Sequence, residues 1–116
     1  YQLVLNHRNH VAVMSRGTFP FNEAPPVLHD FSSDSTFYEG SGAACELEPG
    51  VWGLWSGDIN QDHQVSGLDF SYWQSAAREG RPGYLAEDLN FDGHITTADY
   101  VLWHRAHRRG VNSYVP

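Results

Sequence analysis

The sequence predicts an α+β protein in two parts: a small antiparallel β unit over residues 1–56, then two loop–helix repeats over residues 57–116. Short runs in the first part alternate apolar and polar residues, as in strands with one buried face. In the second part, a pattern of acidic and aromatic residues occurs twice, and each copy continues into an amphipathic segment that ends at a glycine. With 116 residues, the chain can form one small domain or two half-sized modules.

Five short segments of the first part predict strands: QLVLN (2–6), HVAVMS (10–15), VLHDF (27–31), TFYEG (36–40) and VWGLW (51–55). The tripeptide HRN separates the first two segments, as in a hairpin or a bulged bend, while NEAPP and GSG interrupt the later ones. Because the strand pattern begins at the first residue, we expect this chain to be the C-terminal piece of a longer protein.

The second part repeats itself at an offset of 30 residues, with DINQDHQVSGLDFSYWQSAAREG aligned to DLNFDGHITTADYVLWHRAHRRG. The identical pairs are Asp58/Asp88, Asn60/Asn90, Asp62/Asp92, Asp69/Asp99, Trp73/Trp103, Ala76/Ala106, Arg78/Arg108 and Gly80/Gly110. Agreement at this many positions indicates a structural repeat rather than chance.

Each repeat predicts a loop followed by a helix of about ten residues that ends at Gly80 or Gly110, a residue suited to a left-handed cap. Phe70, Trp73 and Ala77 share a face of the first helix, and Tyr100, Trp103 and His107 share a face of the second. We expect both Trp side chains to pack between the two helices, which run antiparallel. The last turn of the second helix carries Arg105, Arg108 and Arg109, which suit the helix dipole and could also form a basic contact patch.

The loops carry oxygen ligands at the spacing that an EF-hand-type calcium loop requires, namely positions 1, 3, 5, 7 and 12, with position 7 contributing its backbone carbonyl. In the first loop these positions are Asp58, Asn60, Asp62, Gln64 and Asp69, and in the second they are Asp88, Asn90, Asp92, His94 and Asp99. All the side-chain ligands are oxygens, which favour calcium over zinc. The sequence therefore predicts two Ca²⁺ ions, which would change the formal net charge from −7 to −3.

Two further loop positions bear on this prediction. Position 8 should be an aliphatic residue that packs inward and pairs with the other loop, and Val65 and Ile95 fit. Position 6 needs a sharp turn, often with positive φ, which Gly93 adopts freely and His63 adopts with some strain. We therefore expect the first loop to bind calcium more weakly than the second.

Charge and composition exclude several classes of function. All seven basic residues are Arg, and the net charge of −7 argues against binding to nucleic acid. No window is long and apolar enough to insert into a membrane. Cys45 is the only cysteine, and no base partner for it is evident. The acidic residues that might pair for glycoside hydrolysis belong to the loops, so we expect no enzymatic activity.

The paired loops resemble the duplicated calcium-binding segments of dockerin type I domains. More closely, YQLVLNHRNHVAVMS, VWGLWSGDINQD, the loops and the terminal NSYVP together resemble a module found at the C-terminal ends of large secreted proteins of Bacteroidetes. This resemblance covers nearly the whole chain. It implies a non-enzymatic, calcium-stabilised module, secreted to the extracellular space or the cell surface, that holds proteins together.

The resemblance also bears on which partner we expect the chain to bind. Many dockerins have a Ser-Thr pair just before the last loop acid, but this chain has Gly67-Leu68 and Thr97-Ala98, so we do not expect cohesin binding by the usual contacts. The Bacteroidetes modules have further β sequence before the HRNH segment. A β unit without that neighbour would expose an edge, so self-association by strand addition, even into an extracellular fibre, is a second possibility.

Other residues have weaker patterns. His7 and His10, and separately His104 and His107, have spacings that can ligate zinc, although backbone hydrogen bonding or a solvated helix face is the more usual role. The rings of Trp52, Trp55, Tyr38 and Tyr84 could instead stack on a glycan, which makes a carbohydrate-binding adhesion module the alternative function; we expect one of the two Trp rings to be core. The tripeptide Asp34-Ser35-Thr36 resembles the motif that Bacteroidetes O-glycosylate on exported proteins, so Ser35 is a candidate glycan attachment site.

Overall fold

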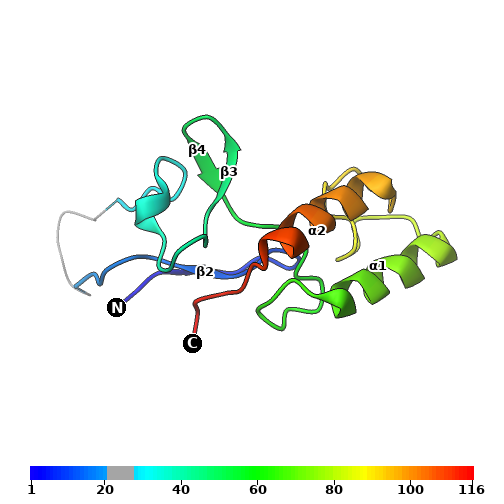
Figure 1. Cartoon of the computed structure of the whole chain (residues 1–116), viewed down its shortest axis with the longest axis horizontal. Coiled ribbons are helices and arrows are strands. Elements are labelled where there is room, and N and C mark those ends of the chain that lie inside the picture. Colours follow the sequence, from blue (N-terminus) through cyan, green and yellow to red (C-terminus); the bar gives the residue numbers. More distant parts are fainter. Residues whose placement is uncertain (21–27) are drawn as a thin grey trace.

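A computed structural model describes residues 1–20 and 28–116 of the chain. The molecule is elongated, with principal extents of 51 × 28 × 25 Å. Two strand pairs and a short 3₁₀ helix lie toward one end, and two α-helices lie at the other (Figure 1). The α+β class predicted from the sequence is confirmed, and the two strand pairs are antiparallel as expected.

The first strand pair joins β1 (Val4–Leu5) to β2 (Val13–Met14), with Val4 opposite Met14. Both predicted segments contain these strands, but the strands are only two residues long. Between them the HRN bend is closed by a 3.2 Å hydrogen bond from the His10 amide to the His7 carbonyl. The residues of β2 are buried, whereas Val4 and Leu5 of β1 are exposed. This pair therefore has one strand in the core and one strand at the surface.

The second strand pair is a hairpin of β3 (Cys45–Glu48) and β4 (Val51–Gly53). The sequence predicted β4 within VWGLW but missed β3, because two of its four residues are Glu, which strands disfavour. The turn at Pro49-Gly50, with Gly50 at φ 80°, nonetheless folds the chain back. A register shift between Glu46 and Glu48 marks a bulge in this hairpin.

Two predicted strands are wrong. The TFYEG segment overlaps a 3₁₀ helix, η1 (Ser35–Phe37), because the Asp34 side chain accepts a 2.8 Å hydrogen bond from the Thr36 amide and starts a turn. Only Tyr38 retains strand character, as an isolated bridge to Ser15. Residues 28–31 of VLHDF form no strand, and Asp30 within this segment accepts a 2.9 Å hydrogen bond from the Ser32 amide, which starts a turn. Val27 lies outside the described residues.

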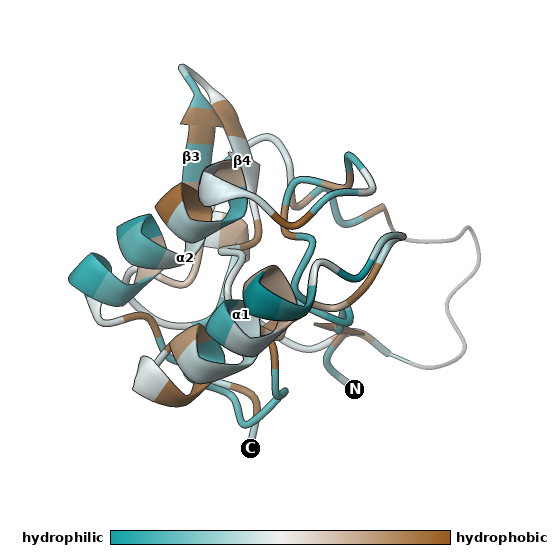
Figure 2. Ribbon diagram, turned by 90° about the vertical axis from the view of Figure 1, so that its right-hand side faces the viewer, coloured by the Kyte–Doolittle hydropathy of each residue, from teal (hydrophilic) through white to brown (hydrophobic). Residues whose placement is uncertain are grey.

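Helices α1 (Gly67–Glu79) and α2 (Thr97–Arg109) are three residues longer than predicted, and each has 13 residues. Both end at the predicted glycine in a left-handed conformation, with φ 64° at Gly80 and at Gly110. The helices run antiparallel and side by side (Figure 1), and hydrophilic and hydrophobic residues alternate along both (Figure 2). In both views the β3–β4 hairpin stands on the α2 side of this pair.

Aromatic side chains form the contact between the helices. Phe70 of α1 lies 5.2 Å from Trp103 of α2 between ring centroids, and Trp73 lies 5.5 Å from Tyr100. Trp103 is only 6% exposed and Trp73 is half-buried, so the expected packing of both Trp side chains between the helices is confirmed. This interface aligns the two repeats.

One hydrophobic cluster contains residues from both sides of residue 57. Val11, Cys45 and Trp55 from the β unit pack with side chains of the repeats, which are Ile59, Val65, Leu89, Trp103, Ala106 and Val111. A smaller cluster of Val13, Tyr38, Ala43 and Ala44 lies under the strands. Among the described residues, no helix has the length and apolar character needed to cross a membrane.

Candidate metal centres in two loops

The last acidic residue of each loop organises both the loop and the helix that follows. Asp69 is the third residue of α1 and forms a capping box with Ser66, whose backbone N–H donates to Asp69 Oδ2 at 2.7 Å. The other carboxylate oxygen, Oδ1, accepts hydrogen bonds from the backbone N–H groups of Ile59 at 2.7 Å and Asn60 at 3.2 Å. A single buried carboxylate therefore joins the start of the loop to the start of the helix.

The first acidic residue closes the loop from the other side. Asp58 Oδ1 accepts from the Asp62 amide at 3.1 Å, and Oδ2 accepts from the His63 amide at 3.2 Å. Between them, Asn60 donates from its side-chain amide to Asp62 Oδ2 at 3.1 Å, and Asp62 Oδ1 accepts from the Gln64 amide at 3.1 Å. The four predicted side-chain ligands of the first loop thus belong to one hydrogen-bonded turn.

The second loop repeats this arrangement atom for atom. Asp99 accepts from the amides of Leu89, Asn90 and Thr96 at 2.8, 3.2 and 2.8 Å. The remaining bonds again converge on Asp88, Asn90 and Asp92, in the following set: Asp92 N–H to Asp88 Oδ1 at 3.2 Å, Gly93 N–H to Asp88 Oδ2 at 2.9 Å, Asn90 Nδ2 to Asp92 Oδ2 at 3.2 Å and His94 N–H to Asp92 Oδ1 at 2.9 Å. The sequence repeat is therefore also a repeat of these hydrogen bonds.

Both loops turn through positive φ at the position that the sequence identified. His63 has φ 76° and Gly93 has φ 83°, so the predicted turn conformation is confirmed. The structure adds a second such position that the sequence did not reveal, because Gln61 (φ 59°) and Phe91 (φ 61°) are also left-handed. Apart from Gly, Asn, Asp and His, residues rarely adopt this conformation.

The acidic side chains of the first loop come close enough to share a cation. Asp58, Asp62 and Asp69 each place one oxygen within 4.8 Å of the others, and across residues 1–20 and 28–116 no other set of three metal-capable side chains meets this spacing. Burial and then the charge of Asp69 raise the pKa of Asp58 to about 6, and burial raises the pKa of Asp69. A cation would offset this cost of placing buried like charges together, so this group could hold a metal ion.

The remaining predicted ligands are the residues at position 7. Gln64 lies opposite Asn112 in an isolated antiparallel bridge. The hydrogen bonds of that bridge are made by the neighbouring His63 carbonyl and Val65 amide, so the Gln64 carbonyl is not used in the pairing. Both Gln64 and His94 are exposed. The expected pairing of Val65 with the other loop takes a different form, since the Val65 amide donates to the Val111 carbonyl at 3.2 Å, while Ile95 is half-buried.

The N-terminal bend contacts both loops, which the sequence did not predict. Asn9 is fully buried, and its side-chain amide donates to the carbonyls of Ala86 at 3.1 Å and Asp88 at 3.0 Å. Gln61 of the first loop donates to the His10 carbonyl at 3.2 Å and to the Asp58 carbonyl at 2.8 Å. The HRNH segment therefore supports the backbone of both loops, and its only signal in the sequence was the family resemblance.

The two histidine pairs occupy aromatic surroundings. The Nδ1 atoms of His7 and His10 lie 3.1 Å apart, and both contact Asn9 Oδ1; burial, followed by the charge of His7, lowers the pKa of His10 to about 4. Within the described parts of the chain, no third His, Cys or acidic side chain completes a metal set with them. His104 stacks on Tyr100 and His107 stacks on Trp103, with centroids 5.6 and 4.7 Å apart.

The candidate glycan-stacking rings separate into core and surface. Trp55 is 6% exposed and Tyr38 is 1% exposed, so both belong to the core, as expected for one of the Trp pair. Trp52 is half-buried and Tyr84 is exposed. Ser35, the candidate glycan attachment site, is half-buried at the start of η1. Cys45 is buried, and burial raises the pKa of its thiol.

Comparison with protein-family models, with curated proteins and with solved structures gave no match for this chain.

Proposed function

We propose that this chain is a non-enzymatic, calcium-stabilised extracellular module that mediates protein–protein assembly through a framework of paired dockerin-like repeats. The observation that carries the proposal is the shared hydrogen-bond pattern of the two loops, in which the buried first and last acids of each loop accept hydrogen bonds from backbone amides of the same loop. Calcium would be held by Asp58, Asn60, Asp62 and Asp69 in the first loop and by their counterparts 30 residues later in the second.

The role of calcium in this proposal is to provide folding free energy. Without a cation, the carboxylates of the first loop repel one another in a partly buried site, and ionising Asp58 is unfavourable, as the raised pKa of that group shows. An ion that binds the folded loop and not the open chain stabilises the fold by mass action. Because the loops also carry the contacts to Asn9 and to the C-terminal segment, their closure would order much of the molecule.

The assembly role is supported by the exposed edge of the first strand pair. Within the described residues the first sheet has two strands, and the Val4 and Leu5 side chains of β1 are 49% and 42% exposed. An exposed strand with apolar side chains can pair with a strand of another chain. We propose strand addition at β1, with a second copy or with a different protein, as the route to fibres or to cell-surface complexes.

A glycan-binding role has less support. Sugar recognition by stacking needs free ring faces, and Trp55 and Tyr38 are buried. The remaining two rings, Trp52 and Tyr84, come from the β3–β4 hairpin and from the segment between the helices.

The experiment is a calcium titration of the chelator-treated chain, followed by far-UV circular dichroism, Trp fluorescence and sedimentation. We expect calcium to restore helix and to shift sedimentation toward larger species. The control is the double variant Asp58→Asn and Asp88→Asn, which keeps the shape of both side chains but removes one charge from each loop. If calcium leaves the helix signal of the native chain unchanged, the calcium part of the proposal is wrong. If helix forms and the native chain stays monomeric, self-assembly is wrong and a different partner is required.

A further inference from the structure

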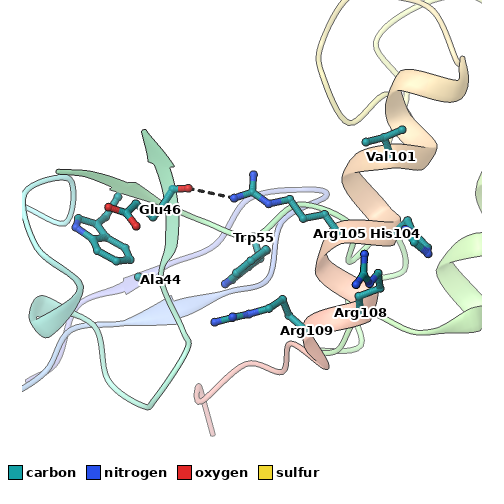
Figure 3. Close-up of a pocket in the computed structure, with 9 residues that line it drawn as sticks. Ala44, Glu46, Trp55, Val101, His104, Arg105, Arg108 and Arg109 are labelled. Carbon is teal, nitrogen blue, oxygen red and sulfur yellow. Dashed lines mark hydrogen bonds between the residues drawn. The ribbon is translucent and has the colours of Figure 1, made fainter. Parts of the chain in front are cut away.

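A cleft lies between the β3–β4 hairpin and α2, away from both calcium loops. Its volume is about 690 Å³, and its lining joins one acidic and two aromatic side chains of the β unit to a basic face of the helix (Figure 3). The residues are Ala44, Glu46, Trp52, Trp55, Val101, His104, Arg105, Arg108 and Arg109. The proposed calcium function uses none of these residues.

Three of the seven Arg residues of the chain gather here, although the formal net charge is −7. Arg105, Arg108 and Arg109 are all exposed, and the ion pairs formed within the described residues are those of Arg81 with Glu79 and Glu87. Arg105 donates to the Glu46 backbone carbonyl at 3.1 Å, not to its carboxylate. Within the described residues, Arg105, Arg108 and Arg109 therefore form no ion pair.

Two of these Arg side chains are held in place by an aromatic ring. The guanidinium carbons of Arg105 and Arg109 lie 5.4 and 5.7 Å from the Trp55 ring centroid, and in Figure 3 they lie on either side of that ring. Trp55 is itself fixed by a 3.1 Å hydrogen bond from Nε1 to the Gly42 carbonyl. Ordering two flexible cations beside each other is unfavourable, because side-chain entropy is lost and the like charges repel. Attraction to a bound anion would offset this free-energy cost.

The charge of this helix end is not required by the repeat. The equivalent residues of α1 are Ser75, Arg78 and Glu79, and α1 also ends in a left-handed glycine cap. Favourable interaction with the helix dipole therefore needs no more than one basic residue in α1, whereas the last turn of α2 carries His107, Arg108 and Arg109. The additional cations of α2 occur on the helix that borders the cleft.

We propose that this cleft binds an acidic segment of a partner protein, with Asp or Glu carboxylates on Arg105, Arg108 and Arg109. This inference rests on the proposed assembly function and adds the chemistry of the partner. The planar guanidinium groups suit bidentate binding of carboxylates, and Trp52 and Val101 offer apolar contact to the aliphatic parts of the segment. The carboxylate of Glu46, at the hairpin side of the cleft, disfavours carboxylates there and directs them toward α2.

Other polyanions fit the cleft less well. An acidic glycan would gain most from ring stacking, but Trp55 is buried and flanked by the two guanidinium groups. A nucleic acid would extend beyond the cleft onto a surface whose overall charge is negative. A short acidic peptide segment needs only the local patch.

The test measures fluorescence anisotropy of a labelled oligo-glutamate peptide with the calcium-treated full chain, and an oligo-glutamine peptide serves as the uncharged control. We expect the oligo-glutamate peptide to bind and to dissociate as salt is raised. The double variant Arg105→Gln and Arg109→Gln should weaken binding by about tenfold or more. The matched double variant Arg78→Gln and Arg81→Gln, which also takes the net charge from −7 to −9, should change binding less than about twofold.

A second pair of variants distinguishes a loss of peptide binding from misfolding of the chain. Arg108 lines the cleft, and its side chain has no hydrogen bond or ion pair to the described residues. Arg108→Gln should therefore keep the native circular dichroism spectrum while weakening peptide binding about threefold. Its counterpart in the other repeat, Arg78→Gln, should leave binding unchanged. Three results would overturn the proposal: an equal loss of affinity in both members of a variant pair, binding of oligo-glutamine, or failure of oligo-glutamate to bind. Binding of a heparin oligosaccharide in place of the peptide would also overturn it.

The calcium titration on the same samples keeps the two proposals separate. A chain that folds with calcium but does not bind oligo-glutamate contradicts the cleft proposal alone. A chain that binds the peptide with the expected variant pattern but shows no response to calcium supports the cleft and contradicts the calcium-dependent function.

Discussion

The two repeats, residues 58–80 and 88–110, have the same loop hydrogen bonds but different surroundings. The first loop pairs with the C-terminal segment, through the Val65 amide on the Val111 carbonyl and the Ser113 amide on the His63 carbonyl. The second loop instead accepts the Asn9 side chain of the N-terminal bend on its Asp88 carbonyl. The N-terminal bend thus contacts both loops, because Gln61 of the first loop also donates to the His10 carbonyl, whereas the C-terminal segment pairs with the first loop.

The differences between the repeats separate the features that the two proposed calcium loops share from the features that each repeat adds. The acidic side chains and the amides they bind are the same in both copies, so they define the loop itself. The repeats differ in the turn residue, in the hydrogen-bond partner of each Trp and in the charge of each helix end. The loop does not require these features, so they can contribute to packing or to binding. The predictions below test that division, beginning with the carboxylates.

Removing the last acid of either loop should have the largest effect. Asp69→Ala and Asp99→Ala each leave three backbone N–H groups without their acceptor, at about 1 kcal/mol or more apiece, so we expect each variant to lose about 3 kcal/mol or more of unfolding free energy in calcium. Urea unfolding measures this, with exposed Glu79→Ala as the control. If one of the two variants stayed within about 1 kcal/mol of the native chain, the two loops would not be equivalent in folding.

Lowering the pH should weaken calcium binding at the first loop. Calcium needs the charged carboxylate, and the pKa of Asp58 is raised to about 6, so protons compete for this group as the pH falls through 6. Between pH 7 and pH 5 we expect the affinity to fall about tenfold, in the direction of weaker binding at low pH. Calorimetric titration of Asp88→Asn, in which the second loop is disabled, isolates the first loop. An affinity unchanged at pH 5 would contradict the role of Asp58 as a ligand.

Sequence reasoning succeeded where the chemistry is local. The left-handed turns at His63 and Gly93 and the glycine caps depend on residues within one repeat, and the repeat itself doubles that signal. Sequence reasoning missed β3, because two of its residues are Glu and the strand forms through the Pro-Gly turn that follows it. It was also wrong at TFYEG, where Asp34 caps a 3₁₀ helix. Long-range contacts such as Asn9 on Asp88 have no local pattern, and neither does the collection of Arg side chains beside Trp55.

The two equivalent Trp residues should respond differently to the same substitution. Trp103 donates from Nε1 to the Ser66 carbonyl at 3.0 Å, whereas Trp73 Nε1 is buried without a partner among the described residues. Trp103→Phe breaks a hydrogen bond, but Trp73→Phe removes an unpaired donor, so the first should be less stable than the second by about 1–2 kcal/mol. Urea unfolding of both variants measures the difference. Equal stabilities would mean that ring packing alone determines the contribution of this position.

The smallest effect concerns the turn residue, which is where the loops differ most in sequence. His63 holds φ 76° at a position where its counterpart is Gly93 at φ 83°, and a side chain at such an angle costs about 1 kcal/mol. His63→Gly should therefore stabilise the calcium-loaded chain by about 0.5–1 kcal/mol, after the entropy that glycine loses on folding, and should tighten the first loop a few-fold. Gly93→His should do the reverse, because a Cβ there would meet only the Tyr84 ring, at an ordinary 3.8 Å, so that strain and not collision sets the cost. Calcium titration and urea unfolding of both variants measure these effects. The backbone strain should be relieved in His63→Gly and introduced in Gly93→His, so the two variants should change stability in opposite directions. If the first loop stays weaker after His63→Gly, the cause lies in its acids, which the structure brings within 4.8 Å of one another, and not in its turn.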